Sequence, residues 1–299
     1  MNLLITGAWT GAKDYINQIE NKGHAVVFMQ YEKDDLPCAY EWVEGVICNG
    51  LFLAHPIEKF VNLKYIQLTS AGFDRVPMDY VAEHNIEIYN ARGVYSIPMA
   101  EFAVAGVLQL YKKMDFFRQN QKRHTWNKHR GCLELFGKTV CIVGCGSVGT
   151  ECAKRFGAFG CHVVGVDLYP REDECYESMV HLNELNSVLS GADVVVLTLP
   201  LTDDTYYLMD ADRFALVKKG ACIVNIARGG VVDTDALISA LDKLYGAVVD
   251  VFETEPLDEK NLLWDMENVI ITPHNSFVSE GNHVRLSDVI FENLVESKR

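Results

Sequence analysis

Three residues in the second half of the chain, Arg228, Glu255 and His274, could together move a proton on a small anionic molecule. A guanidinium holds a carboxylate through paired hydrogen bonds, and a histidine tuned by a nearby carboxylate exchanges protons near neutral pH. Each of the three follows an expected β-strand, and ligands of open α/β sheets bind outside the carboxyl ends of strands. Taken singly, the histidine could be structural and Glu255 could lie in a solvated loop with Glu253.

A glycine-rich segment upstream of these residues predicts a bound dinucleotide. The expected strand 139–143 runs into Gly144, Gly146 and Gly149, and a helix is expected over 148–159. Such glycines give a tight turn, let the backbone approach a pyrophosphate and allow close helix contact, while the helix N-terminus supplies N–H groups. The alternative is a structural turn in another doubly wound protein.

The identity of the dinucleotide depends on Asp167. This residue ends the next expected strand, 18 positions after Gly149, near the spacing of about 20 that brings a carboxylate to the adenosine ribose. A carboxylate there repels a 2′-phosphate, so we expect NAD as the cofactor in preference to NADP. The nearby Arg171 keeps NADP open as an alternative.

Composition limits the class of protein and its partners. The chain has 299 residues, 49% of them apolar, and a formal net charge of −14. This acidity argues against nucleic-acid and membrane partners, which require a basic surface. Nine cysteines without a CxxC pair predict reduced thiols in the cytoplasm, and we expect no metal site. The basic cluster Lys122–Arg130 is interpreted as a solvated helix end near a subunit contact, with a nucleic-acid patch as the weaker alternative.

Strands alternating with helices predict an α/β protein with two doubly wound parallel-sheet domains. A Rossmann-like NAD-binding domain is expected over 100–273, inserted in a flavodoxin-like substrate domain made of 1–99 plus 274–299. A single long helix is expected from Met99 to about Gln119, and further helices over 181–190, 203–217 and 233–244. The strands are expected at 3–6, 25–29, 45–48, 65–68, 86–89, 139–143, 162–166, 193–197, 221–225, 246–250 and 268–271.

The order of these motifs closely resembles the D-isomer-specific 2-hydroxyacid dehydrogenase family over nearly the whole chain. Its supporting segments are Ser70–Asp74, Asn90–Ser96, Ala100-Glu101, the GxGxxG motif, Leu199–Thr202 with Thr205, and Asn225–Gly229. The chain departs from the family after His274, where Asn275-Ser276-Phe277 replaces a small apolar stretch.

The resemblance implies an enzyme that interconverts a 2-oxo acid and a D-2-hydroxy acid with NAD, and dimerises through its NAD domain. His274 would be the acid/base, Glu255 would keep it protonated for reduction, and Arg228 would grip the substrate's carboxylate and carbonyl. Other implied contacts are the backbone of Ala71 and Gly72 with the substrate carboxylate; Gly144, Gly146, Ser147, Val148, Gly149 and Asp167 with the dinucleotide; Thr198, Pro200 and Thr205 along its cleft; and Asp250 with the carbonyl of Ala227 at the nicotinamide amide.

The loop after the third expected strand, Cys48–Leu53, indicates which substituent the substrate carries. Family members acting on 3-phosphoglycerate tend to carry basic residues there, and this loop has none. We therefore expect an unphosphorylated 2-oxo acid, small or apolar. Leu51, Phe52 and Leu53 favour an apolar substituent if they face the substrate and not the core of the first domain. The alternative is that Arg75, Arg92 or the Lys122–Arg130 cluster supplies the charge for a phosphate. D-3-phosphoglycerate dehydrogenase and a non-catalytic, NAD-sensing corepressor-like protein are the alternative functions.

Overall fold

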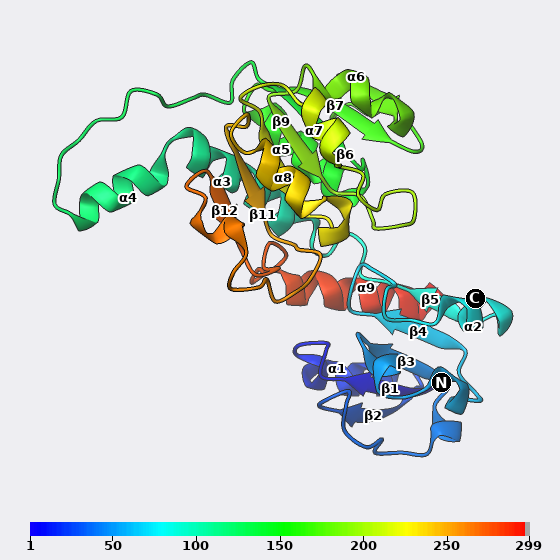
Figure 1. The fold of residues 1–299 in the computed structure, drawn as a ribbon. Helices are drawn as coiled ribbons and strands as arrows, with labels where there is room; N and C mark the ends of the chain where they lie inside the picture. The colour runs from blue at the N-terminus through cyan, green and yellow to red at the C-terminus, as the bar shows by residue number, and fades with distance from the viewer. Residues whose placement is uncertain (297–299) are drawn as a thin grey trace. The chain divides into compact units, whose positions relative to one another are not determined.

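The computed structural model describes residues 1–296, which form two compact units. Unit 1 is Met1–Tyr95 together with the segment from Ser279, and unit 2 is Ser96–Val278 (Figure 1). The units change at 95/96 and 278/279, against the expected boundaries of 99/100 and 273/274. None of the helices in the described part of the chain is long and apolar enough to cross a membrane.

Unit 1 is built on a parallel five-stranded sheet in the order β2-β1-β3-β4-β5. This order is that of flavodoxin-like folds, in which successive connections reverse direction at the β1/β3 pair. The strands are β1 (Asn2–Thr6), β2 (Ala25–Met29), β3 (Gly45–Cys48), β4 (Tyr65–Leu68) and β5 (Glu87–Tyr89).

Helices cover both faces of this sheet because alternate strand residues point to opposite sides. Leu3 and Ile5 pack with α1 (Ala12–Asn21) and α9 (Asn282–Glu296), whereas Leu4 packs on the other face with residues of α2 (Met78–Glu83). The C-terminal helix is tied to unit 1 by polar contacts as well: Trp9 Nε1 donates to Ser287 Oγ at 3.1 Å. The return of the chain to unit 1 is thus fixed by burial and hydrogen bonds together.

Unit 2 is built on a parallel seven-stranded sheet in the order β12-β11-β10-β9-β6-β7-β8, with its topological switch between β6 and β9. The predicted fold of two doubly wound parallel-sheet domains, one Rossmann-like and one flavodoxin-like, is therefore confirmed. The strands are β6 (Thr139–Val143), β7 (His162–Asp167), β8 (Ser178–His181), β9 (Val194–Leu197), β10 (Cys222–Asn225), β11 (Gly246–Val249) and β12 (Val269–Ile271).

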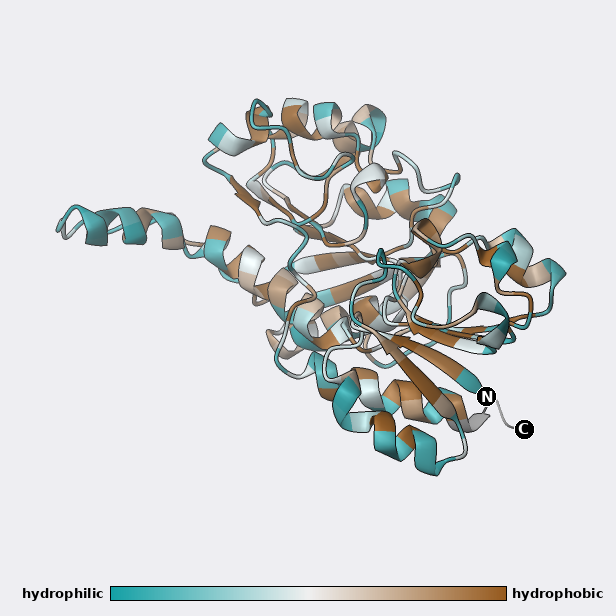
Figure 2. Cartoon of the chain, turned by 90° about the horizontal axis from the view of Figure 1, so that it is seen from below, coloured by the Kyte–Doolittle hydropathy of each residue, from teal (hydrophilic) through white to brown (hydrophobic). Residues whose placement is uncertain are grey.

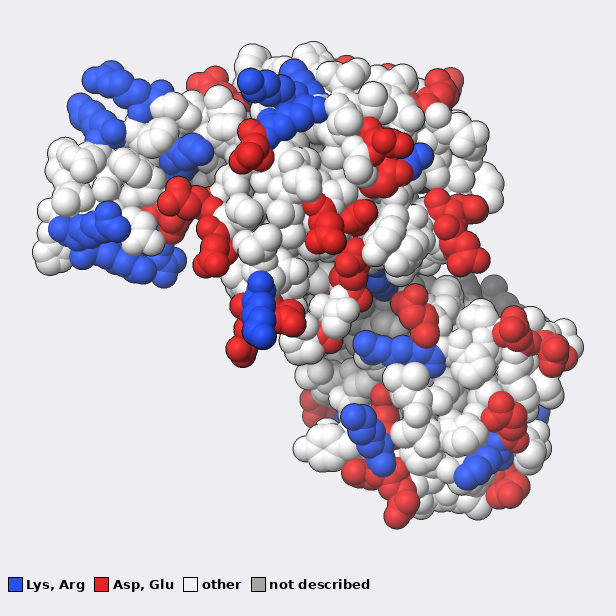
Figure 3. Space-filling model, in the orientation of Figure 1, with Lys and Arg blue, Asp and Glu red and all other residues white. Residues whose placement is uncertain are grey.

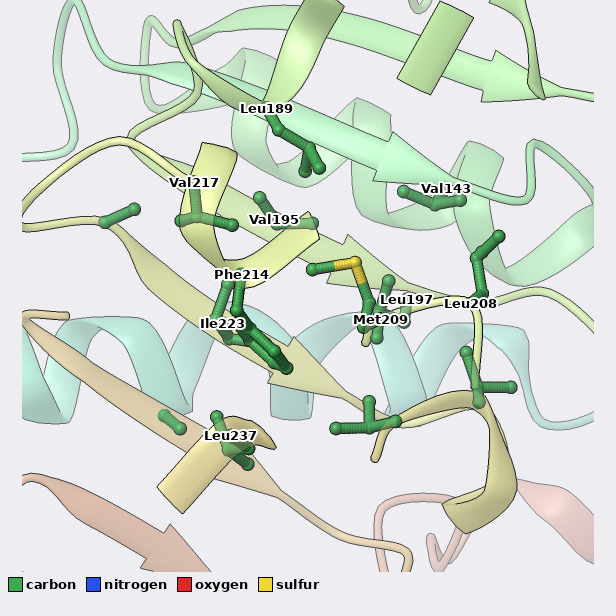
Figure 4. Close-up of a cluster of buried hydrophobic side chains, with 14 of the residues drawn as sticks. Val143, Leu189, Val195, Leu197, Leu208, Met209, Phe214, Val217, Ile223 and Leu237 are labelled. Carbon is green, nitrogen blue, oxygen red and sulfur yellow. The ribbon is translucent and has the colours of Figure 1, made fainter. Parts of the chain in front are cut away.

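Two buried clusters hold this sheet between its helices. On one face Val140 and Ile142 contact α3 (Ser96–Tyr111) and α5 (Ser147–Ala158). On the other, Cys141 and Val143 belong to a cluster that includes residues of α6 (Leu185–Leu189), α7 (Ala211–Leu216) and α8 (Thr234–Ala240), drawn in Figure 4. The central strands β9 and β10 are buried along their whole length, as expected for a sheet covered on both sides, and Figure 2 shows how apolar residues are distributed over the strands and helices.

Several expected helices are wrong in extent. The helix expected over 99–119 is two helices, α3 and α4 (Met114–Lys122), because Lys113 adopts a left-handed conformation with φ 53°. Of the helices expected across 203–217 only α7 is present, and most of 181–190 is a short 3-10 turn followed by α6. Strand β8, whose residues are exposed or half-buried, carries too little apolar pattern to be recognised. Helix α4 extends away from the rest of unit 2 (Figures 1 and 2).

Candidate active site

Arg228 lies just beyond the carboxyl end of β10, where a buried asparagine fixes the chain. The Asn225 side chain, 1% exposed, accepts from Ala227 N at 3.1 Å and donates to the Arg228 carbonyl at 3.2 Å. The half-buried guanidinium donates from Nη1 to the Ala227 carbonyl at 2.8 Å. That carbonyl, expected at the nicotinamide amide, thus already accepts one hydrogen bond.

A glycine brings Arg228 beside the segment that leads to Glu255. A Cβ on Gly229 would lie 1.8 Å from the carbonyl carbon of Phe252, so no other residue fits without moving the backbone. The amide of Phe252 in turn donates to Glu255 Oε1 at 3.1 Å. The arginine and the glutamate are therefore held on contacting segments of unit 2.

His274 and Glu255 form a direct pair: His274 Nδ1 lies 2.8 Å from Glu255 Oε2. The two side chains are 40% and 37% exposed, so both remain accessible to a small molecule. Nδ1 is engaged by the carboxylate, and Nε2 is the ring atom that remains to exchange a proton with a substrate. This geometry can hold an imidazolium and present its second nitrogen to a substrate.

The backbone of His274 is held in an unusual conformation by Asp250. His274 has φ 50°, a region that costs a non-glycine residue energy, and its N–H donates to the Asp250 carbonyl at 2.8 Å. The fully buried Asp250 carboxylate accepts from the hydroxyl of Thr272 and the amides of Asn275 and Ser276. Asp250 therefore positions the loop around His274, and its side chain has no exposed surface for the expected contact with a nicotinamide.

The three glycines of the GxGxxG motif each have a distinct steric role. Gly144 has φ 95°, and a Cβ there would lie 2.7 Å from Leu199 N. A Cβ on Gly149 would lie 2.1 Å from the Gly144 carbonyl oxygen, so this glycine permits close contact between α5 and the loop. A Cβ on Gly146 would meet nothing within 4 Å, so the loop is open at this position.

Gly146 immediately precedes helix α5. The first residues of this helix are Ser147 and Val148, and its N-terminus has no side-chain cap. Uncapped N–H groups and the helix dipole favour an anion there. The residues present therefore fit a dinucleotide pyrophosphate, with Gly146 leaving room for close approach.

Asp167 ends β7 beside this loop. Its carboxylate accepts from Cys145 N at 2.7 Å and from Tyr169 N at 2.9 Å, and its remaining lone pairs can accept from ribose hydroxyls. Arg171 lies against the same loop, with Nη2 2.9 Å from the Cys145 carbonyl. Burial raises the pKa of the Cys145 thiol to about 11, so this side chain is neutral near pH 7 and adds no charge to the loop.

The residues expected along the cofactor cleft differ in exposure. Thr198 is half-buried, and its hydroxyl lies 2.6 Å from the Gly144 carbonyl, where it supports the glycine loop. Thr205, 3% exposed, accepts from Thr202 N at 2.7 Å and lies 2.8 Å from the Pro200 carbonyl. Pro200 itself is exposed. Thr205 therefore shapes the turn, and Pro200 is the residue that offers surface to a ligand.

In unit 1, Ala71 and Gly72 lie in the loop after β4, and side chains fix their carbonyls. Asn90 Nδ2 donates to the Ala71 carbonyl at 2.6 Å, Ser70 Oγ donates to the Gly72 carbonyl at 3.0 Å, and the Tyr95 hydroxyl donates to the Thr69 carbonyl. Within residues 1–296 no acceptor faces the backbone N–H of Ala71 or Gly72. Both donors are available to a carboxylate.

The roles of Asn90, Tyr95 and Asn225 were missed at the sequence level. Each is a polar residue within six positions of a strand end, in a segment that matches the family, and that coincidence was the available signal. Of the two orientations left open for the loop after β3, Leu51 and Phe52 adopt the one toward the core: Leu51 is fully buried and Phe52 packs against the same core of unit 1. Only Leu53, 73% exposed, remains available to an apolar ligand.

Residues 104–276 match the model of the D-isomer specific 2-hydroxyacid dehydrogenase, NAD binding domain. The chain belongs to this family. The resemblance predicted from the motifs is confirmed, and so is NAD as the cofactor that the domain binds. Members of the family are oxidoreductases that act on a CH–OH group with NAD.

Relatives in the family carry different substrate names. The chain is 34% identical to a D-3-phosphoglycerate dehydrogenase of Methanocaldococcus jannaschii over 80% of its length but only 46% of that enzyme. It is 33% identical to a glyoxylate reductase of Thermofilum pendens, over 78% of this chain and 71% of that one. The crystal structure of D-lactate dehydrogenase from Aquifex aeolicus, complexed with NAD and lactic acid, matches with a TM-score of 0.81 and 27% identity, covering 99% of this chain and 96% of that chain.

Proposed function

We propose that the protein reduces a small, unphosphorylated 2-oxo acid to the D-2-hydroxy acid, and catalyses the reverse oxidation. The observation that carries this proposal is the 2.8 Å pair of His274 Nδ1 and Glu255 Oε2, because the segment that leads to Glu255 also contacts the one bearing Arg228. A dehydrogenase needs a proton donor and an anion anchor beside the reacting carbonyl, and these residues supply both.

In reduction, Nε2 of the His274 imidazolium donates a proton to the substrate's carbonyl oxygen as that carbon gains a hydride. Glu255 stabilises the charged ring before the transfer. Arg228 binds the carboxylate and polarises the carbonyl. In unit 1, the backbone N–H groups of Ala71 and Gly72 are donors that can bind a carboxylate. NADH, when bound, would supply the hydride. In oxidation the neutral His274 accepts the hydroxyl proton.

The family includes relatives named for phosphorylated and unphosphorylated substrates, so the substrate class rests on this chain's own residues. The loop after β3 contains no lysine or arginine. Burying a phosphate dianion without a cation is strongly unfavourable. We therefore favour glyoxylate, hydroxypyruvate, pyruvate or a branched-chain analogue over phosphohydroxypyruvate.

The test is NADH oxidation with glyoxylate, hydroxypyruvate, pyruvate, 2-oxoisocaproate and phosphohydroxypyruvate. We expect one of the unphosphorylated acids to give the highest kcat/KM. His274→Ala should reduce kcat by about 10²- to 10⁴-fold, the usual contribution of a general acid, with little change in NADH affinity. Turnover of none of the acids would favour a non-catalytic NAD-binding scaffold, and near-normal turnover by His274→Ala would reject the assigned acid.

We also propose that the protein assembles as a homodimer through the arm formed by residues 112–130, which contains α4. The arm carries seven lysines and arginines against one aspartate, whereas the whole chain has a net charge of −14. Figure 3 shows these basic side chains gathered on the α4 part of unit 2. Met114, Phe117 and Trp126 are 52%, 38% and 95% exposed there. A second copy of this acidic chain is complementary in charge to the arm. The free cysteines along the chain support a cytoplasmic location.

A further inference from the structure

Glu32 has no role in the proposed chemistry. Its carboxylate lies at the edge of the unit 1 sheet where the strands end, and it accepts hydrogen bonds there. Glu32 lies in the turn after β2, and its Oε1 accepts from Thr6 Oγ1 at 2.8 Å and from Asn49 N at 2.7 Å. Its Oε2 accepts from Gly50 N at 2.7 Å. Thr6 ends β1, and Asn49 and Gly50 follow β3. The carboxylate therefore sits between the ends of β1 and β3, the topological switch point where this fold type binds ligands.

Two pairs of neighbouring backbone N–H groups lie at this edge of the sheet, and they differ in whether the chain supplies them with an acceptor. The pair at Asn49 and Gly50 is filled by Glu32, whereas the pair at Ala71 and Gly72 has no acceptor within the described residues. The two loops leave the sheet side by side, because β3 and β4 are paired and Thr69 N donates to the Cys48 carbonyl at 2.8 Å. Adjacent strands lie about 4.8 Å apart.

The two pairs of N–H groups would meet different ends of a substrate. An acid whose carboxylate binds Ala71 and Gly72 has its substituent within reach of the neighbouring loop at Asn49 and Gly50. A phosphate on that substituent needs donors there, since an unpaired buried anion is costly. Both N–H donors of the loop are already taken by a fixed negative charge, which also repels a second anion.

We propose that Glu32 is a specificity-determining residue that occupies the anion site at the end of β3 and so excludes phosphorylated 2-oxo acids. This role deepens the proposed function and rests on it for the identity of the reaction. The occupant is part of the chain, so the loop keeps its shape without a bound anion. A Cβ on Gly50 would lie 3.5 Å from Glu32 Oε2 and 3.6 Å from Arg75 Cδ, so a positive side chain lies by the same loop as the glutamate.

Glu32→Gln tests the proposal, since the amide keeps the size of the side chain and removes its charge. We expect the ratio of kcat/KM for phosphohydroxypyruvate to that for hydroxypyruvate to rise about tenfold or more, as expected for loss of one charge within several ångströms at a protein surface. The matched control is Glu44→Gln. Glu44 also accepts a backbone N–H, from Asn2 at 2.9 Å, but at the amino edge of the same sheet. This control should leave the ratio unchanged.

A second measurement does not depend on turnover. Glu32→Ala empties the site and leaves its donors open, so inorganic phosphate should raise the Tm of this variant more than that of the wild type or of Glu44→Ala. If the wild type reduces no 2-oxo acid, the proposed function fails, and the phosphate-dependent Tm still decides whether Glu32 fills an anion site. An unchanged substrate ratio in an active Glu32→Gln enzyme, or equal phosphate effects on all three Tm values, would overturn the role of Glu32.

Discussion

At the scale of single residues, the site depends on a histidine whose ring and backbone are fixed by different carboxylates. Glu255 holds Nδ1, and the buried Asp250 holds the loop that keeps His274 at φ 50°. A left-handed conformation costs a non-glycine residue on the order of 1 kcal/mol, so the surrounding hydrogen bonds must offset it. Strain retained beside an accessible acid/base pair is typical of a functional position.

Replacing Glu255 with glutamine should slow reduction. Reduction needs the charged imidazolium, and the carboxylate at 2.8 Å stabilises that form. The amide keeps the size of the side chain but carries no charge. Steady-state kinetics with NADH should therefore show a kcat/KM for the 2-oxo acid that is lower by about tenfold or more.

Glu253→Gln is the control for this measurement, since Glu253 is a neighbouring carboxylate that accepts from Thr234 N at 3.2 Å. Its kcat/KM for reduction should match that of the wild type. An equal kcat/KM for Glu255→Gln and the wild type would remove Glu255 from the proton chemistry.

Asp167 should set the cofactor preference in a measurable way. Asp167→Ser removes the charge that repels a 2′-phosphate and leaves Arg171 beside the same loop. We expect the ratio of kcat/KM for NADH to that for NADPH to exceed one in the wild type and to fall about tenfold or more in the variant. Glu172→Ser, which removes an exposed charge nearby, should leave the ratio unchanged. Equal use of both cofactors by the wild type contradicts the prediction.

At the scale of elements, the site is assembled by contacts that leave no room for a side chain. A Cβ on Gly229 would overlap the backbone of Phe252, so Gly229→Ala must separate the segment after β10 from the one that leads to Glu255. We expect a loss of about 1–3 kcal/mol in the free energy of unfolding and a fall in kcat/KM of more than about tenfold.

The matched control is Gly157→Ala in α5, where a Cβ would meet nothing within 4 Å. That substitution should stabilise the protein by about 0.5–1 kcal/mol and leave turnover unchanged. Chemical denaturation and steady-state kinetics of the two variants check both expectations. Normal activity in Gly229→Ala would show that the contact does not position Arg228.

How much of this could be predicted from the sequence differs between elements. The central strands β6, β9 and β10 are short apolar runs buried on both faces, and their pattern is sufficient to locate them. Strand β8 lies at the sheet edge with polar ends, so its pairing with β7 decides its structure. The break between α3 and α4 depends on the backbone of Lys113, which no periodicity records.

The residues of the candidate site also differ in whether the sequence could predict their roles. Arg228, Glu255 and His274 could be recognised because each belongs to a short motif after a strand. Glu32 and Asn90 could not, because their partners lie 17 to 26 positions away in the chain and meet them only through the pairing of the strands of unit 1. Roles that depend on tertiary contacts between loops leave little trace in the local sequence.

At the scale of the whole molecule, charge is distributed unevenly. The arm of residues 112–130 has a net charge of +6, from seven basic residues and one aspartate, so the remainder of the chain has −20. Opposite charges on two surfaces of one chain favour association between copies and disfavour binding to nucleic acid, which the acidic remainder repels. The exposed Trp126 and Phe117 add apolar area to the same arm.

The triple variant Lys122→Glu, Arg123→Glu, Lys128→Glu tests this association. We expect the wild type to sediment as a dimer and the variant as a monomer, because the net charge of the arm falls from +6 to zero and no longer attracts the acidic surface of a second copy. Added salt should weaken the wild-type dimer, since exposed charges are screened beyond about 8–10 Å at physiological ionic strength. The control reverses three exposed lysines of unit 1, Lys13, Lys33 and Lys59, and should remain dimeric. A wild type that is monomeric at micromolar concentration, or a dimer that survives reversal of the arm, would place the subunit contact elsewhere or remove it.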